Sequence, residues 1–188
     1  TNRVEKNGYT DDLVSLLYFE HLDTKRASAI WSFAAHPVTK TYENLQLSAD
    51  YPGSIAHIIE GNELELLGFI SGAIGSMNPK KEGGDDLWLT TPLTNKLRNL
   101  LKTAKASSTA IGKLGFAATT IDFPPMKYRI APELMLLPQL TRSLVASPRL
   151  LIQAFSIGNH SVLTLPGEIS GQLLEPLRND VKHSTSVW

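Results

Sequence analysis

Three polar residues follow apolar runs of the sequence, at places where chemistry could be carried out. His36 comes directly after the run 29–35, Asn78 follows the run 64–70 and a turn rich in Gly and Ser, and Glu168 follows a strand-like segment and Pro-Gly. In layered α/β proteins, functional side chains gather in such loops because the sheet positions them rigidly. Imidazole and carboxylate groups are zinc ligands, so His36 and Glu168 are compatible with a metal site. Asn78 is a third candidate on position alone.

Each candidate also has a purely structural interpretation. A His after an apolar strand is often a packed, hydrogen-bonded core residue, and a Glu at a helix start is often favoured by the helix dipole. The sequence contains no HExxH, Walker A, GxSxG or GxGxxG motif and no Cys. Disulfides, Cys-ligated zinc and a thiol nucleophile are therefore excluded, and both interpretations of the three polar residues stay open.

Short apolar runs and amphipathic segments must position these residues. We expect strands over residues 13–18, 29–35, 64–70, 115–123 and 127–131, and a hairpin over 150–155 and 161–165. We expect helices after Ser54 as a cap, from Thr91-Pro92 to residue 105, and over 169–178, with 133–146 helical or irregular and 80–87 a flexible loop. The pattern predicts an α/β fold, or a mixed α+β one, with a mixed sheet and flanking helices.

Composition excludes several classes of protein. The chain has 188 residues, of which 42% are apolar, and its 18 Lys and Arg balance its 18 Asp and Glu. This is enough apolar material for the core of a single domain over residues 1–188. A chain without net charge lacks the basic surface that nucleic acids require, so we expect no nucleic-acid partner. No apolar run approaches the roughly 18 residues of a membrane-spanning helix.

One stretch departs from this balance. Between residues 95 and 129 the chain carries seven Lys and Arg and a single acid, Asp122. The simpler interpretation is that these cations form the solvated face of the helix over 92–105. The alternative is a peripheral contact with the anionic headgroups of a membrane.

Five segments, taken in order, resemble the neutral/alkaline non-lysosomal ceramidase family. They are Asn2-Arg3, FAAHP at 33–37, SADYPG at 48–53, GAIGSMNP at 72–79 and LPGE at 165–168, the last after a Ser-Ile-Gly turn at 156–158. Members of the family read roughly N-R, F-A-x-H-P, S-x-D-x-x-G, G-x-x-G-D-x-x-P and V-P-G-E. The matches extend from residue 2 to residue 168.

The resemblance implies a zinc-dependent amidase that cleaves the N-acyl bond of ceramide. The family holds zinc with two His, one Glu and one Tyr, and His36 matches the second His while Glu168 matches the Glu. Arg3 matches an arginine that lines the substrate site, where it could stabilise a developing oxyanion. Asn78 stands at the position of a Ser that is important for activity, and Ser76 replaces the Asp of the G-D-x-x-P segment.

The family's first His ligand precedes the N-R pair and its Tyr ligand follows P-G-E. We therefore expect the chain to be the central part of a ceramidase-like catalytic domain, with flanking segments or another chain completing the metal site. The expected substrate is a lipid amide, and the resemblance suggests a secreted or extracytoplasmic location. Two alternatives remain, a catalytically silent binding domain of the same fold and a zinc hydrolase with a non-lipid substrate.

Overall fold

The computed structural model describes residues 1–40, 43–80, 85–108, 112–122, 129–137, 140 and 149–180. Its contacts divide the chain into two compact units. The first unit contains Thr1–Ala110 and Glu168–Lys182, and the second contains Ile111–Gly167. A domain can contain more than one such unit, so a single domain over residues 1–188 remains a prediction.

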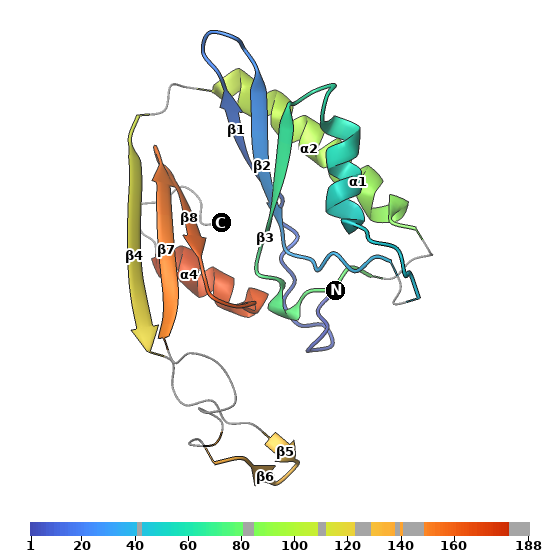
Figure 1. Cartoon of the computed structure of the whole chain (residues 1–188), viewed down its shortest axis with the longest axis vertical. Coiled ribbons are helices and arrows are strands. Elements are labelled where there is room, and N and C mark those ends of the chain that lie inside the picture. Colours follow the sequence, from blue (N-terminus) through green and yellow to red (C-terminus); the bar gives the residue numbers. More distant parts are fainter. Residues whose placement is uncertain are drawn as a thin grey trace. The chain divides into compact units, whose positions relative to one another are not determined.

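The first unit is built around a three-stranded sheet in the order β1-β2-β3 (Figure 1). β1 (Ser15–Glu20) pairs antiparallel with β2 (Ala27–Phe33), and β3 (Leu66–Ser71) pairs parallel with β2. The parallel pair requires a crossover, which α1 (Asp50–Ile59) provides. These strands confirm the three apolar runs expected in this region. Because β2 ends at Phe33, His36 lies in the loop that follows it.

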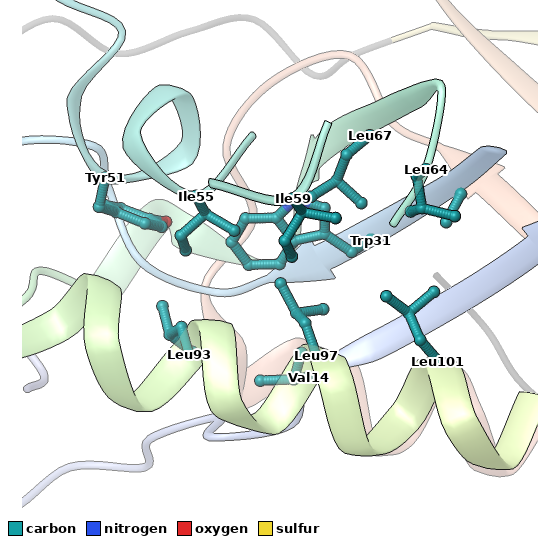
Figure 2. Packing of buried hydrophobic residues seen from close by; sticks show 11 residues of the cluster. Val14, Trp31, Tyr51, Ile55, Ile59, Leu64, Leu67, Leu93, Leu97 and Leu101 are labelled. Carbon is teal, nitrogen blue, oxygen red and sulfur yellow. The ribbon is translucent and has the colours of Figure 1, made fainter. Parts of the chain in front are cut away.

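Helices α1 and α2 (Leu87–Ser107) pack against one face of this sheet and enclose the core. Trp31 of β2 is completely buried, and Ile59 of α1 and Leu97 of α2 belong to the same core cluster around it (Figure 2). The core cluster consists of Val14, Ala29, Trp31, Tyr51, Ile55, Ile59, Leu64, Leu67, Leu93, Leu97 and Leu101. Every one of them comes from the first unit.

Both long helices begin earlier than the sequence pattern predicted. α1 begins at Asp50, so Ser54 lies inside the helix, where its hydroxyl donates to Asp86 Oδ2 at 2.5 Å instead of capping. α2 begins at Leu87, which places Pro92 within the helix. Proline removes only one hydrogen bond, and burial of the helix face outweighs this loss.

The second unit contains an antiparallel sheet in the order β4-β7-β8. β4 (Leu114–Asp122) pairs along its whole length with β7 (Arg149–Ile157), and β7 forms a hairpin with β8 (His160–Thr164). The predicted strands and hairpin are confirmed. Gly158 has φ +58°, a conformation that a tight hairpin turn needs.

Residues 129–135 form a second, short hairpin. β5 (Arg129–Ala131) pairs with β6 (Leu134–Met135). The expectation of a helical or irregular 133–146 is therefore wrong at residues 134–135, because cross-strand backbone pairing is available there. The rest of that segment lies outside the described residues except for 133, 136, 137 and 140. Residue 123, residues 127–128 and residues 81–84 of three other expected segments also lie outside them.

The C-terminal part of the described chain returns to the first unit. A turn of 3₁₀ helix (Gly171–Leu173) leads into α4 (Leu174–Asp180), so the helix expected from residue 169 begins five residues later. The Ser170 side chain accepts a hydrogen bond from Gln172 N, which caps this start. Helices and mixed sheets together confirm a mixed α/β fold. No helix within the described ranges is long and apolar enough to cross a membrane.

Candidate functional site

His36 and Glu168 lie together in the first unit although 132 residues separate them in the chain. His36 Nε2 is 3.1 Å from Glu168 Oε2. The His36 side chain is 15% exposed and that of Glu168 is 55% exposed, so the pair opens to solvent on the carboxylate side. The loop after β2 and the segment before α4 position the two residues.

The surroundings of Nδ1 determine the tautomer of His36. Nδ1 lies 2.7 Å from the carbonyl oxygen of Met77, which can only accept a hydrogen bond, so we assign the proton to Nδ1. In the neutral ring, Nε2 then presents a lone pair to Glu168. A lone pair and a carboxylate oxygen are both acceptors, so their contact requires a proton or a cation between or beside them. A backbone carbonyl on Nδ1 is also the usual support of a metal-binding histidine.

Arg3 is the third member of this group. Its Nη2 lies 3.7 Å from Glu168 Oε2, and its Nε and Nη2 donate to the carbonyl oxygen of Gly75 at 3.2 and 3.1 Å. An antiparallel bridge between Asn2 and Met77 aligns the start of the chain with this loop. The Arg3 side chain is 44% exposed, so the guanidinium is held at one end and remains open to solvent.

The loop over residues 74–78 holds the site in place. Gly75 N donates to Ile169 O at 2.8 Å, while the Ser76 hydroxyl accepts from Gly171 N at 3.2 Å. A Cβ on Gly75 would stand 2.5 Å from Glu168 O, closer than real contacts allow. Glycine is required here because two backbone segments approach each other closely.

Asp50 and Tyr51 hold the loop that carries His36. Asp50 is buried and adopts φ +53°, and its carboxylate accepts from Thr39 N, Thr39 Oγ1 and Lys40 N. Both residues belong to the SADYPG segment at 48–53, whose pattern did not identify their roles in holding this loop. The Tyr51 hydroxyl donates to Ala35 O at 2.7 Å, and burial, with a smaller effect of Asp50, raises the pKa of Tyr51. The hydroxyl therefore remains a donor at neutral pH.

Asn78 lies next to the group rather than within it. Its backbone N donates to Thr1 O at 3.0 Å, and its side chain makes no hydrogen bond to His36 or Glu168. A role for Asn78 in catalysis stays a prediction. Across the described ranges, there is no cluster of three or more His, Asp or Glu that could hold a metal. His36 and Glu168 fit zinc chemically, but they provide only two ligands.

The fold and site thus define a mixed α/β protein with a polar His–Glu–Arg group where the loops of one unit meet. Comparison with solved structures finds the same fold in neutral ceramidase from Pseudomonas aeruginosa, with a TM-score of 0.65, 16% identity and 90% of this chain covered. A structure described as ceramidase complexed with C2 matches with a TM-score of 0.66, also at 16% identity. The chain spans 36% and 38% of the lengths of these two chains.

No protein-family model and no curated protein sequence matches the chain. The similarity therefore lies in the fold, which is ceramidase-like over nine-tenths of the chain. It agrees with the resemblance of the five sequence segments to part of that family.

Proposed function

We propose that this chain contributes His36 and Glu168 to the metal centre of a zinc-dependent hydrolase that cleaves the N-acyl amide bond of a ceramide-like lipid. The observation that carries the proposal is the 3.1 Å approach of His36 Nε2 to Glu168 Oε2. Two acceptor atoms at this distance need a proton or a cation between them, and the proposal places a metal cation there. The ceramidase-like fold and the ordered sequence motifs supply the choice of zinc and of substrate class.

Each residue has a separate task in this proposal. His36 and Glu168 bind the metal, and the carbonyl of Met77 keeps the proton of His36 on Nδ1 so that Nε2 is free to bind. Bound zinc would polarise the amide carbonyl and lower the pKa of a bound water to about 7. Arg3, held by Gly75 O, places a positive charge beside Glu168 where an oxyanion would develop.

A catalytic zinc site has three protein ligands as a rule. The described part of this chain supplies two of them, so the proposal includes further ligands from outside the described residues or from another chain. This requirement makes metal affinity the most informative property to measure.

The first experiment is zinc titration of the chain after purification without chelators. We expect zinc to bind, and His36→Ala and Glu168→Gln each to weaken binding at least about tenfold, since loss of a supporting contact alone has an effect of this size. His57→Ala is the matched control, because His57 is an exposed histidine on α1. Equal losses in His36→Ala and His57→Ala, or no zinc binding at all, would contradict the proposed centre.

The second experiment tests the reaction on the zinc-loaded chain with a fluorescent N-acyl sphingosine as substrate. Hydrolysis that disappears in His36→Ala supports the lipid amidase. Zinc binding without hydrolysis of this substrate would contradict the proposed activity while leaving the metal centre in place, and would favour the silent binding domain or a non-lipid substrate.

A further inference from the structure

A cavity of about 700 Å³ lies in the first unit, lined by the β1–β2 turn, residues 61–65 and the C-terminal half of α2. None of the residues of the candidate metal centre lines it. Five cationic side chains and two acidic ones line it, although the chain as a whole has no net charge. The cations are Lys25, Arg26, Arg98, Lys102 and Lys105, and the acids are Glu63 and Glu65.

Tertiary structure brings these cations together from distant parts of the sequence. Arg98, Lys102 and Lys105 stand at positions i, i+4 and i+7 of α2, which share one helix face. Lys25 and Arg26 come from the β1–β2 turn, more than seventy residues earlier. The basic stretch noted in the sequence is thus only partly a solvated helix face, because its α2 members turn towards a second basic segment.

Ion pairs with glutamates involve three of the five cations. Arg98 Nη2 lies 2.7 Å from Glu63 Oε1, Arg26 pairs with Glu65, and Lys25 Nζ lies 3.3 Å from Glu20 Oε1. Lys102 and Lys105 have no ion pair or side-chain hydrogen bond among the described residues. Glu20 also interacts electrostatically with Lys105, so three acids face the five cations and the cavity keeps a net positive charge.

Hydrogen bonds hold the conformation of the β1–β2 turn, which contributes Lys25 and Arg26 to the cavity. The β1–β2 turn is closed by His21 N donating to Arg26 O at 2.9 Å, and by His21 Nδ1 accepting from Asp23 N and Thr24 N. Lys25 itself adopts φ +58°, which is unfavourable for a residue with a Cβ. Leu64 and Leu101 also line the cavity, and both are buried.

We propose that this cavity binds a phosphate group, with Lys102 and Lys105 as its principal ligands and Lys25 at its rim. Lysine binds phosphate as a compact point charge with three donors, and several lysines around one concave site suit a group that carries up to two negative charges. The phosphate can belong to a soluble phosphomonoester or to a lipid headgroup at a membrane surface. The proposal does not depend on the metal centre.

Two binding arms distinguish these sources. In the first arm, glycerol 3-phosphate is titrated into the full chain by calorimetry. In the second, the chain is sedimented with phosphatidylcholine vesicles that contain or lack phosphatidic acid. Binding in the first arm identifies a soluble phosphomonoester as a ligand, and binding only to vesicles with phosphatidic acid identifies a headgroup. Absence of binding in both arms would overturn the proposal.

The variants test the site rather than the overall charge. Lys102→Gln/Lys105→Gln is expected to weaken binding at least about tenfold, since each lysine near an anionic surface contributes about a factor of five. Lys96→Gln/Lys113→Gln is the matched control, because it removes the same number of charges from two exposed lysines that do not line the cavity. We expect it to change binding less than about twofold. An equal loss in both variants would overturn the cavity as a specific site.

Discussion

The two compact units of this chain are stabilised in different ways. The first unit buries Trp31, Tyr51 and the aliphatic residues of two helices in one core. The second unit pairs nine residues of β4 with nine of β7, yet none of its described residues is buried. Backbone hydrogen bonds hold paired strands together, but side-chain burial supplies most of the free energy of folding. The difference indicates that the β1-β2-β3 sheet is stabilised by its buried core, whereas the β4-β7-β8 sheet is held together mainly by hydrogen bonds between its strands.

Backbone conformation follows the same division. Asn7, Lys25 and Asp50 adopt positive φ without being glycine, and all three belong to the first unit. The described positive-φ residues of the second unit are Gly158 and Gly167. A strained residue persists only where its surroundings determine its conformation completely. The packed first unit can maintain such residues. Two of them lie at the proposed sites, since Asp50 holds the loop that carries His36 and Lys25 lines the basic cavity.

The strongest test of the comparison replaces one aromatic residue in each unit. Trp31→Ala should lower the free energy of unfolding by about 3–5 kcal/mol, because a completely buried side chain leaves a cavity. Phe116→Ala should cost less than about 1 kcal/mol, because Phe116 is 61% exposed and its ring packs on that of Phe155, with 5.0 Å between ring centres. Urea unfolding followed by circular dichroism measures both. Similar losses would show that the second sheet is covered in solution.

Two glycine substitutions sharpen the comparison. Gly75→Ala should destabilise the chain by about 1–3 kcal/mol or more and weaken zinc binding, because its Cβ would meet the backbone oxygens of Glu168 and Ile169 at 2.5 and 2.7 Å. At Gly115→Ala, the new Cβ would meet only the hydroxyl of Ser156 closer than 3 Å. That hydroxyl can rotate, so the change should be within about 0.5 kcal/mol. Thermal unfolding and zinc titration of both variants provide the measurement. Equal losses of stability in Gly75→Ala and Gly115→Ala would contradict the close approach at Gly75.

Tyr51→Phe removes one hydroxyl from the core of the first unit. The carbonyl of Ala35 would lose its partner while buried, which should cost about 1–3 kcal/mol. The substitution should also change the pH dependence. Since burial raises the pKa of Tyr51 above its unfolded value of about 10, the native state keeps a proton that the unfolded state loses, and stability falls as pH rises above about 10.

In Tyr51→Phe this alkaline loss should be smaller. Urea unfolding of both proteins between about pH 8 and 11 provides the measurement. Parallel curves for the two proteins would mean that the hydroxyl does not remain protonated in the native state.

The smallest expected effect comes from Lys25→Gly. Glycine adopts φ +58° without steric cost, so the variant should be more stable by about 0.5–1 kcal/mol despite losing an exposed ion pair with Glu20. Lys25→Ala is the control, because it removes the charge and retains the strain. If both variants had the same stability, strain at this turn would not be present.

Much of the fold could be predicted from the sequence. Strand positions in both units, the hairpin at Gly158 and the amphipathic character of α2 follow from local periodicity and turn residues. Helix starts were less well predicted, as Asp50 and Leu87 show, because burial overrides local signals such as Ser54 and Pro92. The strand expected over 127–131 is present at 129–131, but its partner at 134–135 was missed, since pairing depends on contacts between strands.

The sequence alone determined the fold class and three residues, His36, Glu168 and Arg3, that the structure brings into one group. Their types and ordered motifs are local properties of the chain. Only tertiary structure decided that Met77 O directs the ring of His36, that Gly75 lies against the Glu168 backbone, and that Lys25 and Lys102 line one cavity. Contacts between residues far apart in sequence depend on how the elements pack, and periodicity within one element carries no information about the neighbour it will meet.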